Sequence, residues 1–151
     1  MAEINDWLKV LIKEMYKNNT FVHLLEMNLI SFSSGMSKLS MPVKNDKHTN
    51  IFGICHGGAI ASLADAAMGV ACASLGKRVV TIDLNINYTN GAIPNQIIMA
   101  NASVLHDGNK IIVVECEIIN SVNKLIGKSR GTFYVVGTIE REMYEEFTNQ
   151  S

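Results

Sequence analysis

The feature that most constrains this chain is the stretch Ala59–Leu75, which is built almost entirely of Ala, Val, Ile, Leu, Met, Cys and Ser. Asp65 is the one charged residue within it. Its length predicts a helix over about 57–75, and a helix that is apolar on every side has to be buried on every side. Its alanines and glycines let a sheet approach closely. A curved sheet wrapped round this helix would bury it.

The segments on either side of this helix favour strands, because apolar and polar residues alternate in them and turn residues separate them. The expected elements are an amphipathic helix over about 4–17, a hairpin within about 20–43 that turns near Ser33–Gly35, strands over 79–88, 97–105, 110–119 and 124–136, and a short charged helix from Arg141. This order predicts an α+β fold with one antiparallel sheet, in a single domain over 1–151.

The strand expected over 79–88 has the clearest alternation, which predicts one polar and one apolar face. Its residues divide into a polar set, Thr81, Asp83, Asn85 and Asn87, and an apolar set, Ile82, Leu84, Ile86 and Tyr88. Three later segments carry residue types of hairpin turns: Asn90-Gly91, Asp107-Gly108 and 120–123.

Composition narrows the classes of function. Of the 151 residues, 48% are hydrophobic and 18% charged, which favours a protein that hides apolar surface in a subunit interface. The net charge is −1 and Lys and Arg form no run, so nucleic-acid binding has little support. Asp65 interrupts the longest apolar run, so no membrane span is expected. Cys55, Cys72 and Cys116 form no paired motif, which indicates a reduced, cytoplasmic protein.

A carboxylate in the middle of such a helix is costly. Burying a charge costs several kcal/mol unless it is paired or hydrogen-bonded, and Asp is also a weak helix former. Asp65 could be a carboxylate that reaches polar loop atoms at the helix surface. It could also be a functional carboxylate, since such groups concentrate at active sites.

The start of the helix is the second unusual feature. His56-Gly57-Gly58 places two glycines where backbone N–H groups have no partner within the helix. Glycine lets another molecule approach that backbone, and the positive end of the helix dipole favours an anion or oxyanion. A plain flexible entry turn is the simpler explanation of the same motif.

The spacing of these two features bears on the number of subunits. Gly57 and Asp65 are eight residues apart, which is about 12 Å along a helix axis. They cannot easily reach one carbonyl group within the same chain. Two antiparallel copies of the helix, related by a two-fold axis, would bring Gly57 of one copy near Asp65 of the other. If both act on one atom, the active unit is at least a dimer.

These residues carry a resemblance to a known family. The pattern Asn50-x-x-Gly53-x-x-His56-Gly57-Gly58, followed by Ser62-Leu63-Ala64-Asp65-x-Ala67, resembles the hotdog-fold acyl-CoA thioesterases of the phenylacetate-pathway (PaaI-like) type. The run 80–88 and Gly131-Thr132-Phe133 resemble two of that family's strands. The resemblance implies a hotdog fold, in which a curved antiparallel sheet wraps a long central helix. It also implies a homodimer or homotetramer.

The resemblance implies hydrolysis of an aryl or medium- to long-chain acyl-CoA to the free acid and coenzyme A. Asp65 would activate water as general base or attack as nucleophile, and Asn50 would help to hold that water. The Gly57 N–H would polarise the thioester carbonyl, with His56 beside it.

Gly58 and Thr81 are the further substrate contacts that the resemblance implies. No cofactor or metal is implied, because coenzyme A is part of the substrate. The chain departs from the family after Tyr88, where relatives usually carry a basic residue and 89–94 carries none. The cations that could replace it for the coenzyme A phosphates are Lys77, Arg78, Lys128 and Arg130.

Other constellations have less support. The segment 53–57 matches a nucleophile elbow with Cys55 as nucleophile, but polar residues precede it and the chain is short for that fold. His48, Cys55 and His56 fit no common zinc spacing. A hydratase of enoyl thioesters usually needs an Asp–His motif that the sequence lacks. A non-catalytic acyl-CoA-binding module, or a structural dimer without a ligand, remain as alternatives.

Overall fold

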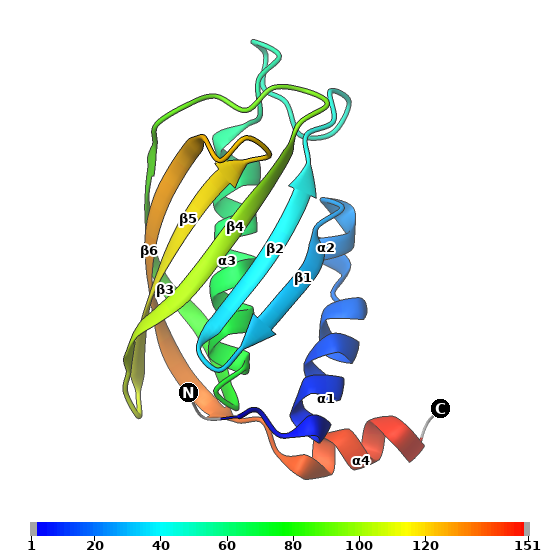
Figure 1. Ribbon diagram of the computed structural model, residues 1–151. Coiled ribbons are helices and arrows are strands. Elements are labelled where there is room, and N and C mark those ends of the chain that lie inside the picture. The colour runs from blue at the N-terminus through cyan, green and yellow to red at the C-terminus, as the bar shows by residue number, and fades with distance from the viewer. Residues whose placement is uncertain (1–2, 150–151) are drawn as a thin grey trace.

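One curved antiparallel sheet wraps a central helix in the computed structural model, which describes residues 3–149 (Figure 1). The elements are α1 (Asp6–Lys17), α2 (Thr20–Leu24), β1 (Asn28–Ser33), β2 (Met36–Pro42), α3 (Gly57–Ala73), β3 (Lys77–Tyr88), β4 (Ile97–Asp107), β5 (Ile111–Asn120), β6 (Leu125–Thr138) and α4 (Arg141–Asn149). The six strands lie in the order β1-β2-β4-β5-β6-β3, so β1 and β3 are the edges.

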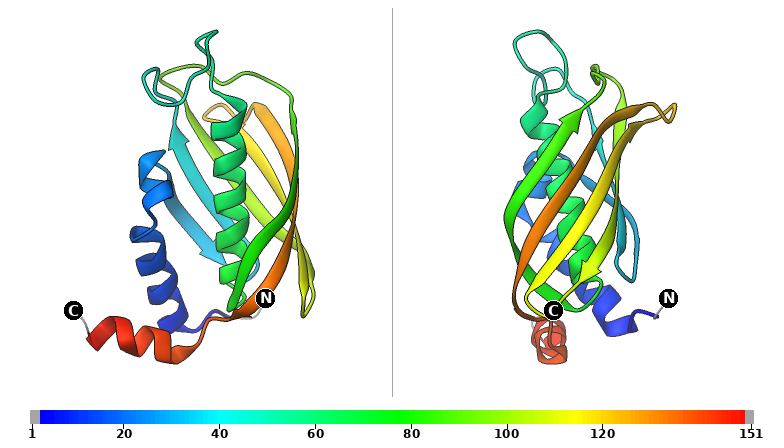
Figure 2. Two further views of the ribbon diagram at one scale, coloured as in Figure 1. Left: turned by 180° about the vertical axis from the view of Figure 1, so that it is seen from behind. Right: turned by 90° about the vertical axis from the view of Figure 1, so that its left-hand side faces the viewer.

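The apolar helix α3 lies on the concave side of the sheet, as expected (Figure 2). Its fully buried residues face strand residues that are equally buried, among them Leu39, Ile98, Ile112, Val114 and Phe133. The approach is close at Gly131 of β6, where an added Cβ would lie 2.8 Å from the Met68 sulfur of α3. Small residues therefore let this helix fill the curve of the sheet.

Helix α1 flanks α3 on the same side of the sheet, next to the edge strand β1 (Figure 2). Leu8, Leu11 and Ile12 form a second apolar cluster with Ile139, which precedes α4. The partly buried Val70 joins this cluster to α3. The amphipathic pattern of the first helix thus reflects packing against α3 and the C-terminal segment.

The hairpin expected within 20–43 is confirmed only from Asn28 onward. β1 and β2 pair antiparallel and turn at Ser33–Met36, where Gly35 has a positive φ of 72°. The earlier residues form the short helix α2 instead. The Asn19 side chain caps this helix by accepting a hydrogen bond from the Val22 N–H at 3.2 Å. This local capping outweighs the loose alternation of the sequence.

The expectation of a hairpin at Asn90-Gly91 is wrong. β3 and β4 are not neighbours, because β3 pairs with β6 at one edge and β4 lies between β2 and β5. The Asn90 side chain donates to the Leu125 carbonyl at 2.8 Å and so fastens the connection to the start of β6. The turns at Asp107-Gly108 and 120–123 do join neighbouring strands.

The simple alternation expected for β3 is also wrong, because the strand contains a bulge. Thr81 pairs with Phe133 and Asp83 with Thr132, so Ile82 is an extra residue on β3. An extra residue shifts which side chains face inward. Thr81 therefore faces α3, on the same side as Leu84 further along, and not the polar outer face.

Candidate active site

Asp65 lies on the face of α3 that is turned toward β3. The Thr81 hydroxyl donates to Asp65 Oδ1 at 2.7 Å. The bulge of β3 makes this contact possible, since it turns Thr81 inward. Asp65 and the neighbouring Ala66, Gly69 and Val70 are only partly buried in the single chain, so α3 is not buried on every side as expected.

An apolar cavity of about 480 Å³ opens beside Asp65. α3 contributes Gly69 and Val70 to its wall, β3 contributes Val79, and α1 contributes Met15 and Tyr16. Asp65 is the one carboxylate among the described residues that line it. The N-terminal helix therefore does more than seal a sheet edge, because it forms one wall of the space next to the carboxylate.

At the start of α3, the two glycine N–H groups differ. The His56 side chain is the N-cap, and its Nδ1 accepts a hydrogen bond from the Gly58 N–H at 2.8 Å. This pattern assigns the proton of the neutral ring to Nε2. The Gly57 N–H has no acceptor within residues 3–149. The unpaired donor at the positive end of the helix is thus that of Gly57.

Tyr88, at the end of β3, holds this helix start in place. Its hydroxyl donates to the Gly57 carbonyl at 2.8 Å, and burial raises the pKa of Tyr88. The hydroxyl therefore stays protonated at neutral pH and remains a donor. Sequence reasoning assigned Tyr88 only to the apolar face of a strand. The sequence feature that could have identified Tyr88 is its hydroxyl at the end of β3, the strand that follows α3 and runs back toward the start of that helix.

Asn50 shapes the turn before α3. Its Oδ1 accepts hydrogen bonds from the Phe52 N–H at 2.9 Å and the Ile54 N–H at 3.3 Å. Thr49 and Cys55 close the turn with an isolated bridge. The side-chain oxygen is therefore used within the turn, and the amide NH₂ is the part of Asn50 that can serve a bound molecule.

His48 supports the same turn from inside the protein. It is 1% exposed, its Nδ1 accepts from the Lys44 N–H at 2.9 Å, and its Nε2 donates to the Leu25 carbonyl at 2.8 Å. Its own carbonyl accepts from the His56 N–H at 2.7 Å. Both ring nitrogens are engaged, which speaks against a metal ligand. Among residues 3–149, no three His, Cys, Asp or Glu side chains are grouped to hold a metal.

The structure brings the sequence-predicted residues into two groups. Asp65 and Thr81 form one group, and Asn50, His56 and Gly57 gather at the start of α3. Gly57 and Asp65 are eight positions apart along the helix, or about 12 Å. A single chain therefore presents two halves of a site on one rigid element.

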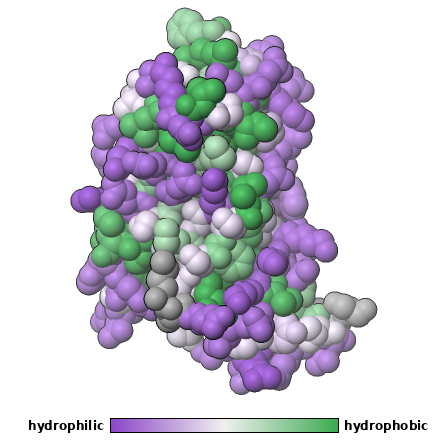
Figure 3. Space-filling view, viewed as in Figure 1, coloured by the Kyte–Doolittle hydropathy of each residue, from purple (hydrophilic) through white to green (hydrophobic). Residues whose placement is uncertain are grey.

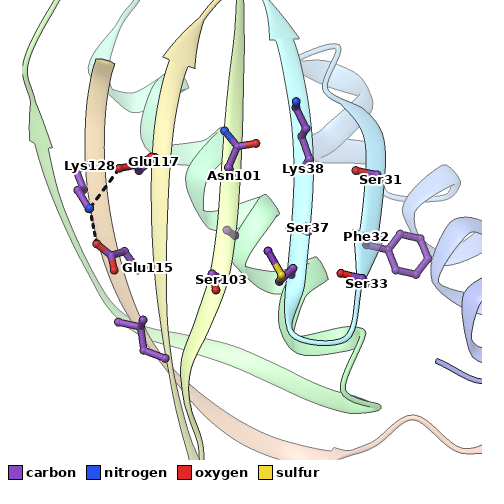
Figure 4. Close-up of a pocket in the computed structure, with 13 residues that line it drawn as sticks. Ser31, Phe32, Ser33, Ser37, Lys38, Asn101, Ser103, Glu115, Glu117 and Lys128 are labelled. Carbon is purple, nitrogen blue, oxygen red and sulfur yellow. Dashed lines mark hydrogen bonds and ion pairs between the residues drawn. The ribbon is translucent and has the colours of Figure 1, made fainter. Parts of the chain in front are cut away.

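The candidate cations for coenzyme A phosphates fall in two places. Lys128 and Arg130 lie on the outer face of the sheet, away from α3. Lys128 pairs there with Glu115 at 2.7 Å and with Glu117 at 3.3 Å (Figure 4). Lys77 pairs with Asp107. Arg78 lines the Asp65 cavity and forms no ion pair within the described residues.

The structure argues against Cys55 as a nucleophile. It is 5% exposed, and burial raises the pKa of its thiol to about 11. The thiol therefore stays protonated at neutral pH, whereas the thiolate is the nucleophilic form.

We expect Cys55→Ala to leave kcat/KM for an acyl-CoA within about threefold of wild type. Iodoacetamide should label the native protein slowly at pH 7 and label all three cysteines after denaturation, because burial also raises the pKa of Cys72 and Cys116, each to about 12. Mass spectrometry of the alkylated protein measures this. Rapid native labelling of Cys55 with loss of turnover would reinstate the cysteine hypothesis.

Within residues 3–149, none of the helices combines the length and apolar character that crossing a bilayer requires.

Comparison with known proteins finds thioesterases among the relatives of this chain. The family model described as the Thioesterase superfamily matches residues 52–126, which include the start of α3, Asp65 and Thr81. Acyl-coenzyme A thioesterase PaaI of Escherichia coli is 31% identical over 123 residues, which are 82% of this chain and 87% of that protein. Acyl-coenzyme A thioesterase 13 of Homo sapiens is 32% identical over 136 residues, which are 87% of this chain and 96% of that protein.

Solved structures agree with these relatives. The structure of the E. coli PaaI protein from the phenylacetic acid degradation operon matches with a TM-score of 0.84 and 28% identity, over 89% of this chain and 97% of that chain. A Streptococcus mutans UA159 protein, solved bound to acetyl CoA, matches with a TM-score of 0.73 and 28% identity, over 76% of this chain and 91% of that chain.

Proposed function

This chain belongs to the thioesterase superfamily as a PaaI-like member with the hotdog fold, and we propose that it hydrolyses acyl-CoA thioesters with Asp65 as the catalytic carboxylate. The observation that carries the assignment is the hydrogen bond from Thr81 to Asp65 beside an apolar cavity. Two acyl-coenzyme A thioesterases at 31% and 32% identity support the reaction class.

The chemistry follows from the polarity of these groups. The Thr81 hydroxyl occupies one carboxylate oxygen of Asp65, which leaves the other oxygen to take a proton from water. The resulting hydroxide adds to the thioester carbonyl carbon. The carbon–sulfur bond then breaks, and Asp65 gives the proton that it took from water to the departing coenzyme A thiolate.

Gly57 stabilises the negative charge that develops on the carbonyl oxygen. Its N–H is the unpaired donor at the positive end of α3, and one such donor contributes roughly 2.7–4 kcal/mol in the transition state. Asn50 offers its amide NH₂ to the attacking water. His56 fixes the start of the helix as its N-cap, because its Nδ1 accepts the hydrogen bond from the Gly58 N–H. Gly58 has no side chain, so the substrate can lie close to its backbone.

The complete site needs a second copy of the chain, because Gly57 and Asp65 are too far apart on α3 to share one carbonyl. β3 is an edge strand, and its Val80 and Ile82 are 52% and 56% exposed. Pairing two copies through this edge, with the α3 helices antiparallel, would cover this apolar surface.

The turn before α3 offers further surface for such a partner. Ile51 and Phe52 there are 92% and 81% exposed. Apolar side chains gather at the top of the space-filling view, where this turn lies (Figure 3). Exposed apolar groups of this kind favour contact with another subunit.

The substrate we propose has an apolar acyl group that occupies the cavity beside Asp65. The S. mutans relative was solved with acetyl CoA, which supports a coenzyme A thioester as the substrate class. Arg78, at the cavity and without an ionic partner in the described chain, is the remaining candidate for a phosphate contact. The three unpaired cysteines fit a reducing, cytoplasmic setting.

Thiol release from short, medium, long and aryl acyl-CoAs tests this function. We expect a free acid and one coenzyme A thiol per turnover. An enoyl-CoA that gains water but keeps its thioester would indicate a hydratase. Saturable acyl-CoA binding without release of any thiol would indicate a binding module. Either result would replace the proposed function.

A site shared between two chains predicts complementation. A mixed dimer of one Asp65→Asn chain and one Gly57→Pro chain contains one doubly altered site and one unaltered site. We expect about half of the wild-type turnover per dimer, although each parent is nearly inactive, because each site takes one group from each chain. Co-expression with two different affinity tags isolates the mixed dimer, and thiol release measures its turnover.

The control is a single chain that carries both substitutions, co-expressed with wild type. That mixed dimer has one altered group in each of its two sites, so it should be nearly inactive. The reverse result, a nearly inactive mixed dimer and a control dimer with about half of the wild-type turnover, would show that each site is built within one chain.

A further inference from the structure

Gly69 lies one helical turn after Asp65 on the same face of α3. The two residues are separated by four positions, which is about 6 Å along the axis and about 40° around it. Apart from the backbone of its own helix, an added Cβ at Gly69 would meet no heavy atom of the described residues within 4 Å, and the residue lines the Asp65 cavity. The missing side chain is therefore what leaves space next to the carboxylate.

Tyr16 of α1 forms another wall of this space. It lines the Asp65 cavity of about 480 Å³ and also a second groove of about 790 Å³ between α1 and β1. Met27, Leu29 and Phe32 line the groove on the β1 side, and charged side chains such as Lys9 and Lys13 line it on the α1 side. Tyr16 thus stands between two cavities.

The Tyr16 hydroxyl does not explain why a tyrosine stands there. It is a buried oxygen without a hydrogen-bond partner among the described residues, and burial raises the pKa of Tyr16. An unpaired buried hydroxyl lowers stability. The ring therefore accounts for the position, since it separates the cavity from the groove and packs against the core.

We propose that Gly69 and Tyr16 set the size of the acyl group, Gly69 by leaving room beside the thioester and Tyr16 by closing the cavity against the α1–β1 groove. This inference rests on the proposed function for its substrate class. It assigns specificity to two residues that take no part in the chemistry. Acyl groups that fit within the cavity bind, and the Tyr16 ring blocks longer chains from extending into the α1–β1 groove.

The first test is a graded series at Gly69. Gly69→Ala and Gly69→Val add one and three carbons to open space, so the fold should accept them, and both are better helix formers than glycine. One methylene in a pocket changes discrimination about 10-fold or more. We expect the kcat/KM ratio of octanoyl-CoA to acetyl-CoA to fall stepwise, by at least about tenfold in Gly69→Val. An unchanged ratio in folded Gly69→Val would overturn the role of Gly69.

The second test is at Tyr16. Tyr16→Ala should join the cavity to the groove and raise the ratio of hexadecanoyl-CoA to octanoyl-CoA about tenfold or more. Tyr16→Phe keeps the ring and should hold the wild-type limit. Tyr16→Leu serves if the alanine variant does not fold, and Val10→Ala, an exposed position on α1, is the matched control. The proposal would be contradicted if the ratio of hexadecanoyl-CoA to octanoyl-CoA rose as much in Tyr16→Phe as in Tyr16→Ala. It would also be contradicted if the ratio rose in none of the folded Tyr16 variants.

Binding measurements separate this inference from the proposed reaction. In an Asp65→Asn background, calorimetric Kd values for the same acyl-CoAs should show the same changes of ratio without turnover. Wild type that releases no thiol while these Kd ratios shift would remove the proposed function and keep the size filter. Turnover by wild type, with Kd ratios that no variant changes, would keep the proposed function and remove the size filter.

Discussion

Asp65→Asn should lower kcat for acyl-CoA hydrolysis at least about a hundredfold. The amide has nearly the same shape as the carboxylate, and its oxygen can still accept the hydrogen bond from Thr81. It has no negative charge, so it can neither take a proton from water nor attack a carbonyl. The loss therefore follows from charge alone, whether Asp65 acts as general base or as nucleophile.

The controls for this variant are its melting temperature and its oligomeric state. Asp65 is partly exposed, so its neutral replacement should leave both close to wild type. Thr81→Val supplies a second comparison, because it removes the hydroxyl that orients the carboxylate but keeps the charge. We expect it to lose less activity than Asp65→Asn. Turnover that Asp65→Asn leaves intact would mean that another group activates the water.

The fold could be predicted to the extent that local patterns determine it. The almost entirely apolar composition of 59–75 predicts a largely buried helix, and alternation in the later segments predicts a sheet to bury it. The order of strands was beyond such patterns. Alternation shows which face of a strand is buried but not which strand lies beside it, so the placement of β3 next to β6 could not be foreseen.

The bulge in β3 had the largest effect on the site. The sequence 80–88 alternates without a break, so nothing in it marks Ile82 as an extra residue. Pairing with β6 creates the bulge, and pairing is a non-local property. For this reason the alternation alone predicts Thr81 on the polar face of the strand. The resemblance to the family is what points to Thr81 as a site residue.

The site residues divide in the same way. Asp65 and Gly57 could be found from the sequence because each breaks a local rule, a charge in an apolar helix and a pair of glycines at its start. Tyr16 and Tyr88 obey local rules, as residues of an amphipathic helix and of an apolar strand face. Their positions at the cavity and at the helix start depend on how distant elements pack.

Gly57→Pro should lower kcat by about 100- to 1,000-fold relative to Gly57→Ala, because it removes the one N–H that is proposed to stabilise the oxyanion. Proline is well tolerated at the first position of a helix, which Gly57 occupies. The preceding His56 has φ −63° and ψ 135°, a conformation that a following proline allows. The helix should therefore form in this variant without the donor.

Gly57→Ala is the matched control, since it keeps the N–H and adds the same Cβ. That Cβ would lie 3.1 Å from the Tyr88 ring and hydroxyl, so both variants require Tyr88 to move by a few tenths of an ångström. Tyr88 is 49% exposed and has room to move. A loss shared equally by both variants would assign the effect to this contact and not to the N–H. A loss confined to kcat of the proline variant would identify the donor as one that acts in the transition state.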